Sequence, residues 1–140
     1  METIALYITS GVLGGMVFFA SVVAPTVFQT LPPEKAGSFL RALFPKYYLA
    51  LIGGSGFAAF FFISTALVSA LVAGAIAIST LWVRQILVPR INRLRDSELA
   101  GDATAGKDFA RLHRISVIIN LIQFVLLAGI LVLHQSFAKA

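Results

Sequence analysis

Apolar residues along this chain gather into long runs that are separated by short polar connections. A helix needs roughly 20 mostly apolar residues to cross the hydrocarbon core of a bilayer. We therefore expect membrane-spanning helices over about residues 3–30, 47–65, 69–90 and 112–134. The second and third helices are expected to meet near residues 64–69, where serine and threonine residues cluster.

A short amphipathic segment, about residues 33–44, separates the first two apolar runs. Its apolar residues fall on one helical face, and its charged and hydroxyl residues fall on the other. This pattern is typical of a helix that lies in the membrane interface. Pro45 is expected to end it, because proline inside a helix removes a hydrogen bond and clashes with the preceding turn. The longest hydrophilic stretch, about residues 92–111, is expected to form a loop.

These elements predict an all-α fold, namely an integral membrane four-helix bundle with a short amphipathic interfacial helix between the first and second spans. The whole chain, residues 1–140, is expected to form a single membrane domain. Composition agrees, since 59% of the residues are hydrophobic and 12% are charged, against about 45–50% apolar and about 25% charged in soluble domains. The chain has no cysteine and two histidines, so we expect no metal site and no cofactor.

The basic residues predict the orientation of the chain in the membrane. Ten of the eleven lysines and arginines lie in or near the first and third connections, and Lys139 lies on the other side. Basic residues favour the cytoplasmic side, so we expect both connections in the cytoplasm and both termini outside, in a bacterial inner or plasma membrane. Charges between apolar runs indicate contact with the bilayer and with anionic headgroups, and they disfavour nucleic acid. The ten residues are Lys35, Arg41, Lys46, Arg84, Arg90, Arg93, Arg95, Lys107, Arg111 and Arg114.

The last apolar run carries a stripe of polar side chains. Its members are His113, Ser116, Asn120 and Gln123. Successive members are 3, 4 and 3 residues apart, which places them on one face of a helix. Such groups either hydrogen-bond between membrane helices or border a functional cavity. The pattern leaves both alternatives open.

Further candidates lie in the same cytoplasmic half. Arg84 precedes Pro89 by five residues, so it either extends to the headgroups or joins the polar stripe. Pro25 is expected to kink the first helix, either as a packing device or beside a binding site. The candidate polar pocket comprises Thr26, Gln29, Tyr47, Arg84, Gln85, His113, Ser116, Asn120 and Gln123.

Three functional hypotheses follow from these patterns. The first is that the protein binds or passes a small neutral or anionic solute through a cytoplasm-facing polar pocket. The spans contain no internal carboxylate to couple protons or cations, and so few helices would require a homo-oligomer, which the G-x-x-x-G formed by Gly11 and Gly15 would allow. The second, about equally favoured, is a non-catalytic structural or lipid-interacting membrane module.

The third and least favoured hypothesis is a haem-linked redox protein or an enzyme that uses His113. His113 and His134 are 21 residues apart, or roughly 32 Å along one helix, so they cannot ligate one haem in a single chain. The pattern shows no nucleophile–base pair and no carboxylate dyad. We therefore assign no catalytic residue and disfavour an enzyme.

Three segments resemble a known family. The run GGMVFFASVVAPTVFQTLPPEKAGSFLRALFPKYY and the later pair PRINRLRD and FARLHRISVIINLIQF are similar to the transmembrane-protein-205-like family. The resemblance implies a four-helix multi-pass membrane protein of unknown function, with no known reaction. The positions that carry it are Pro25, Phe28, Phe44, Pro45, Tyr47, Pro89, Arg90, His113, Ser116 and Asn120.

Overall fold

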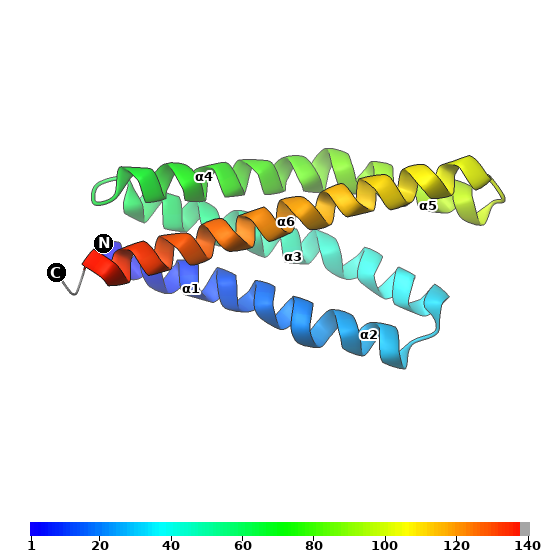
Figure 1. The fold of residues 1–140 in the computed structure, drawn as a ribbon, viewed down its shortest axis with the longest axis horizontal. Coiled ribbons are helices and arrows are strands. Elements are labelled where there is room, and N and C mark those ends of the chain that lie inside the picture. The colour runs from blue at the N-terminus through cyan, green and yellow to red at the C-terminus, as the bar shows by residue number, and fades with distance from the viewer. Residues whose placement is uncertain (138–140) are drawn as a thin grey trace.

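The computed structural model describes residues 1–137, and Lys139 lies outside them. Helical elements join end to end into four rods that run alternately back and forth (Figure 1). The N-terminus, the turn between α3 and α4, and the last turns of α6 gather at one end, which we call the terminal end. The other two connections lie at the opposite end, called the basic end. The elements are α1 (Glu2–Phe18), η1 (Phe19–Val23), α2 (Ala24–Thr30), α3 (Pro33–Phe62), α4 (Leu67–Trp82), η2 (Val83–Leu87), α5 (Val88–Leu99) and α6 (Ala103–Phe137).

The prediction of an all-α membrane protein is confirmed. The rods Glu2–Thr30, Leu67–Leu99 and Ala103–His134 are long and apolar enough to cross a membrane. Within residues 1–137, α3 does not meet that criterion, because Lys46, tyrosines and glycines dilute the apolar character of its residues 45–62. The structure therefore establishes three candidate spans, and the predicted fourth span over residues 47–65 is not confirmed.

The predicted helix end at Pro45 is wrong, and so is the predicted separate helix over residues 33–44. Helix α3 continues through Pro45 from Pro33 to Phe62. Proline removes one backbone hydrogen bond, but packing holds the helix on both sides of it. Leu40 is buried near Val27 before the proline, and Tyr48 is buried after it.

The predicted loop over residues 92–111 is wrong. Only residues 100–102 form a turn, because α5 continues to Leu99 and α6 begins at Ala103. Gly101 has a φ of +105°, which glycine adopts without steric cost. Asp102 Oδ1 then accepts hydrogen bonds from the backbone N–H groups of Thr104 (2.9 Å) and Ala105 (3.3 Å). This N-cap stabilises the start of α6. The hydrophilic residues of the expected loop thus lie on exposed helical faces.

Two turns of π-helix precede two of the prolines. Element η1 ends two residues before Pro25, and η2 ends two residues before Pro89. A proline ring clashes with the carbonyl of the preceding α-turn, and a π-turn is one way in which a helix accommodates a local disruption. Arg84 and Gln85 lie within η2.

The core is a series of small apolar clusters along the rods. Small residues let the helices approach closely, and Gly54 of α3 faces Val12 of α1 without room for a side chain. Many large apolar side chains are exposed on the outer surface, including Val68 at 74% and Ile78 at 71%. In a membrane, lipid covers such a surface. The clusters are built around Ala58, Phe62 and Ala73; Met16, Leu51 and Ile76; Tyr48, Val83 and Leu87; and Val27, Ala36 and Leu40.

Candidate functional site

An aromatic cluster marks the level at which the first rod meets α3. Phe19, in η1, lies 4.6 Å from Tyr47 between ring centroids. Phe44 stacks on Tyr48 at 5.7 Å with an interplanar angle of 17°. Tyr47 contacts Phe19 of the first rod and both Phe44 and Tyr48 of its own helix, so packing holds this predicted site residue in place.

Gln123 is the most completely paired member of the polar stripe. Its side chain extends from α6 towards α4, and the residue is 4% exposed. Its Nε2 donates hydrogen bonds to Ser79 Oγ at 2.9 Å and Thr80 Oγ1 at 3.1 Å. Both hydroxyls in turn donate to the carbonyl of Ile76. Ser79 and Thr80 were not among the residues predicted from the sequence, although adjacent hydroxyls in an apolar run are a detectable signal.

Asn120 lies one turn from Gln123 on the same helix. The Tyr47 hydroxyl donates to Asn120 Oδ1 over 3.4 Å, which is long for a hydrogen bond. In the described part of the chain, the buried Asn120 Nδ2 has no hydrogen-bond partner. A buried donor without a partner is costly, and among the described residues of the stripe this amide nitrogen is the buried side-chain donor without one.

Arg84 reaches across to α3. Its Nε donates a hydrogen bond to the Pro45 carbonyl at 3.3 Å, and its side chain is half-buried. It therefore joins the third rod to α3 instead of facing an empty space. Gln85, the next residue, is exposed.

The remaining predicted residues do not join this group. His113 is exposed, and its ring stacks on Phe109 at 5.8 Å. Ser116 is buried, but its hydroxyl donates to the His113 carbonyl within its own helix at 2.7 Å. Thr26 and Gln29 are exposed on α2. The structure thus brings Tyr47, Arg84, Asn120 and Gln123 to one region. It leaves Thr26, Gln29, Gln85 and His113 on the surface and pairs Ser116 within its own helix.

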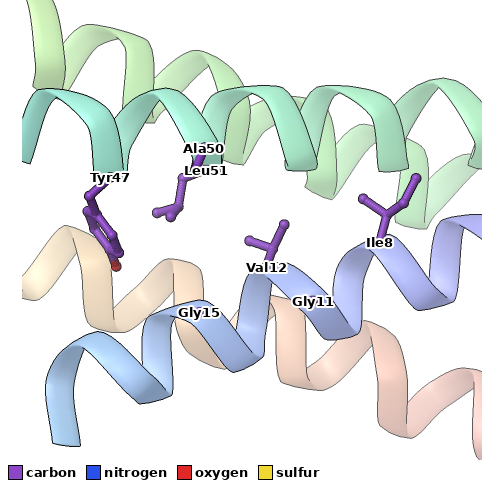
Figure 2. A pocket seen from close by; sticks show the side chains of 7 residues that line it. All are labelled: Ile8, Gly11, Val12, Gly15, Tyr47, Ala50 and Leu51. Atoms are coloured by element: carbon purple, nitrogen blue, oxygen red, sulfur yellow. The ribbon is translucent and has the colours of Figure 1, made fainter. Parts of the chain in front are cut away.

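Two grooves lie beside this region, and both are mainly apolar. The larger, about 330 Å³, runs between α1 and α3, with Tyr47 at one end (Figure 2). The smaller, about 230 Å³, runs between α4 and α6. Arg84 and Asn120 line neither groove. The lining residues are Ile8, Gly11, Val12, Gly15, Tyr47, Ala50 and Leu51 in the first groove and Ala75, Ile76, Ser79, Ile119, Ile122, Gln123 and Leu126 in the second.

The basic end carries more cations than its acids neutralise. Arg41 pairs with Asp96 at 2.8 Å, and Arg95 pairs with Glu98 at 2.6 Å. Seven further basic side chains are exposed there and form no ion pair with any residue in the described range 1–137. These seven, called the basic cluster below, are Lys35, Lys46, Arg90, Arg93, Lys107, Arg111 and Arg114.

Comparisons with known proteins point to one family. Residues 8–99 match the family described as Domain of unknown function (DUF4149). An uncharacterized protein of Aquifex aeolicus (strain VF5) is 30% identical over 135 residues, which cover 91% of this chain and 92% of that protein. No solved structure matches the chain. The resemblance to the transmembrane-protein-205-like family is corrected by these findings, because neither match indicates it. The motifs that suggested it are mostly apolar, and apolar segments of membrane proteins match easily by chance.

Proposed function

This chain belongs to the DUF4149 family, and we propose that it is a lipid-interacting membrane module whose basic end holds anionic headgroups. The observation that carries the proposal is the basic cluster, whose seven exposed cations form no ion pair within residues 1–137, together with the exposed apolar side chains along the rods. Each lysine or arginine near an anionic membrane surface contributes about 1 kcal/mol of attraction. In this proposal α3 crosses the membrane as a fourth span, and the basic end faces the cytoplasm, as the positive-inside rule favours.

The pairing within the polar stripe supports a packing role for it. Gln123 is satisfied by two hydroxyls of α4, and Arg84 by a carbonyl of α3. Hydrogen bonds between membrane helices contribute on average about 0.6 kcal/mol and up to about 2 kcal/mol. A polar solute route would require free polar groups that border a shared cavity, whereas the grooves beside these residues are mainly apolar.

Lipid selectivity tests the proposal. The protein is reconstituted in nanodiscs of phosphatidylcholine that contain a minor fraction of spin-labelled phosphatidylglycerol or spin-labelled phosphatidylcholine, and the immobilised fraction of each label is measured. We expect a preference for the anionic label that falls roughly fivefold for each cluster charge removed, because about 1 kcal/mol corresponds to that factor.

The variants compare unpaired with paired cations. Arg90→Gln with Arg93→Gln removes two members of the basic cluster. Arg41→Gln is the matched control, because the Arg41 charge is already offset by Asp96. Equal immobilisation of the two labels by the unmodified protein would refute the proposal, as would an equal effect per charge in the control.

A second candidate function rests on the Asn120 amide. Its buried, unpaired Nδ2 would suit a carbonyl or hydroxyl of a small neutral solute, or an anion. Passage of such a solute through so small a bundle would require a homo-oligomer. Flux of a small neutral polyol and of a small anion into proteoliposomes tests this candidate, with Asn120→Leu and Arg84→Ala as variants. Loss of flux in Asn120→Leu supports solute passage, and unchanged flux in both variants excludes it.

A further inference from the structure

A second polar cluster lies at the terminal end, remote from the basic end. It joins side chains from α1, α4 and α6. His134 Nδ1 lies 2.7 Å from Glu2 Oε1, and His134 Nε2 lies 3.0 Å from Ser69 Oγ. The His134 side chain is 12% exposed and Ser69 is 8% exposed. These residues are 65 and 132 positions apart in the chain, so the fold alone brings them together.

The order of atoms in this cluster is that of a nucleophile, a base and an orienting acid. A carboxylate only accepts hydrogen bonds, so Glu2 holds the proton of His134 on Nδ1. Nε2 is then free to accept the proton of the Ser69 hydroxyl. The Phe62 ring stacks on the imidazole at 5.2 Å and 21°, which fixes its plane. The same connectivity, with carboxylate on Nδ1 and serine on Nε2, activates serine nucleophiles on unrelated folds.

Backbone donors are available beside the serine. Ser69 is the third residue of α4, which begins at Leu67 and has no side-chain hydrogen bond at its N-cap. The N–H groups of a first helical turn have no partner within the helix, and they carry the positive end of the helix dipole. Such donors stabilise the oxyanion that forms when a nucleophile attacks a carbonyl.

The surroundings indicate the class of substrate. Ile63, Leu67 and Val68 precede the serine by at most six residues and are 62%, 63% and 74% exposed. In a membrane these side chains contact acyl chains, so the apolar part of an ester would lie next to the segment that carries the serine. We propose that Ser69 and His134, oriented by Glu2, form a serine acyl-transfer site that cleaves esters of apolar acids at the membrane interface.

The reaction balances with these groups and water. Ser69 Oγ attacks the ester carbonyl carbon while His134 Nε2 takes the hydroxyl proton. The ester C–O bond breaks, the alcohol leaves with that proton, and the acyl group stays on Ser69. Water then attacks the acyl carbon and gives its proton to Nε2, which returns it to Ser69 Oγ as the carboxylic acid departs. Glu2 takes no part in bond making and acts as a positioning residue. The sequence pattern does not reveal this nucleophile–base pair, because its members lie on different rods.

A fluorophosphonate probe tests the site in the full chain, purified in detergent micelles and in nanodiscs. Intact-mass and peptide analysis should find a single adduct at Ser69. Ser69→Ala should abolish labelling, and His134→Gln should slow it by roughly 10²–10⁴-fold. The matched control is Ser64→Ala, which changes an exposed serine in the neighbouring turn and should label as the unmodified protein does. Hydrolysis of 4-nitrophenyl octanoate should follow the same order.

The positioning role of Glu2 is tested separately. Glu2→Gln should slow labelling, and Glu2→Asp should restore part of the rate, whereas a merely structural contact would leave the rate unchanged. Two results decide the main question. No Ser69 adduct in it, or equal labelling of it and a folded His134→Gln variant, would overturn the proposal. Neither result bears on lipid selectivity at the basic end, so the two proposals fail independently.

Discussion

Replacing Gly54 with alanine tests the closest approach between α1 and α3. A Cβ at Gly54 would collide with Val12 Cγ2, and Val12 Cβ would lie 3.8 Å away. Figure 2 shows Val12 pointing from α1 towards α3. Valine in a helix strongly prefers one χ1 rotamer, so Val12 cannot turn aside without cost.

The expected magnitude follows from two opposing terms. Alanine is favoured over glycine inside a helix by about 0.8–1.0 kcal/mol. Overpacking of a tight contact costs about 1–3 kcal/mol. Gly54→Ala should therefore change the free energy of unfolding by between about zero and about 2 kcal/mol of destabilisation. At the neighbouring Gly53 nothing lies within 4 Å of an added Cβ. Gly53→Ala should therefore stabilise the protein through helix propensity alone, with no steric cost.

Equilibrium unfolding in mixed micelles, followed by helical circular dichroism, measures both variants. The difference between them isolates the steric cost, which we expect to be about 1–3 kcal/mol. Val12→Ala removes the colliding methyl, so the Val12→Ala, Gly54→Ala double variant should recover most of that cost. A difference between the two glycine variants below about 0.5 kcal/mol, which is the usual error of additivity, would refute the reasoning.

Three further predictions use the same assay. Gln123→Leu removes two hydrogen bonds between α6 and α4, and at about 0.6 kcal/mol each it should destabilise the protein by about 1 kcal/mol. Arg41→Ala breaks an ion pair whose side chains are 43% and 59% exposed, so its effect should stay below about 1 kcal/mol and fade at high salt. Hydrogen bonds from the Thr104 hydroxyl and from backbone N–H groups hold the pKa of Asp102 below its usual value. Because this pKa is lowered by folding, the ionised Asp102 stabilises the folded state. That stabilisation is complete above the unfolded pKa of about 4 and is lost as the pH falls through the folded pKa. Asp102→Asn keeps a cap but cannot titrate, so it should flatten the acid limb of the stability curve.

Each of these predictions has a contrary result. Unchanged or increased stability in Gln123→Leu would show that the hydrogen bonds to the two α4 hydroxyls contribute nothing net. A salt-independent loss in Arg41→Ala would point to packing of the side chain instead of its charge. An acid limb in Asp102→Asn that matches the unmodified protein would assign the pH dependence to other carboxylates.

Local composition predicted the elements better than their ends. Long apolar runs imply helices wherever lipid surrounds them, because the backbone must satisfy its own hydrogen bonds there. Pro45 and the hydrophilic residues 92–111 misled the prediction for a shared reason. Each is locally unfavourable to a buried helix, yet packing on Tyr48 and Leu40 in one case, and exposed helical faces in the other, permit the helix to continue.

At the candidate site, too, the sequence predicted which residues share a helix face but not which residues on other helices they contact. The spacing of the polar stripe placed Asn120 and Gln123 on one helical face, as a periodic pattern within one helix can. It could not show that Gln123 would pair with hydroxyls of α4, or that Arg84 would bond to the Pro45 carbonyl. Those partners lie on other rods, and their distances depend on how the rods rotate and approach.

By itself, therefore, the sequence determined that this is an all-helical membrane protein with its cations concentrated in two connections, because burial in lipid and local charge are properties of single segments. Only the tertiary structure decided which polar groups meet. The clearest example is the contact of Glu2, His134 and Ser69. These three residues lie on different rods, so no spacing along the sequence indicates that they meet. Three rods must reach the terminal end in a particular rotation before such a cluster exists, and that rotation is set by side-chain packing along their whole length.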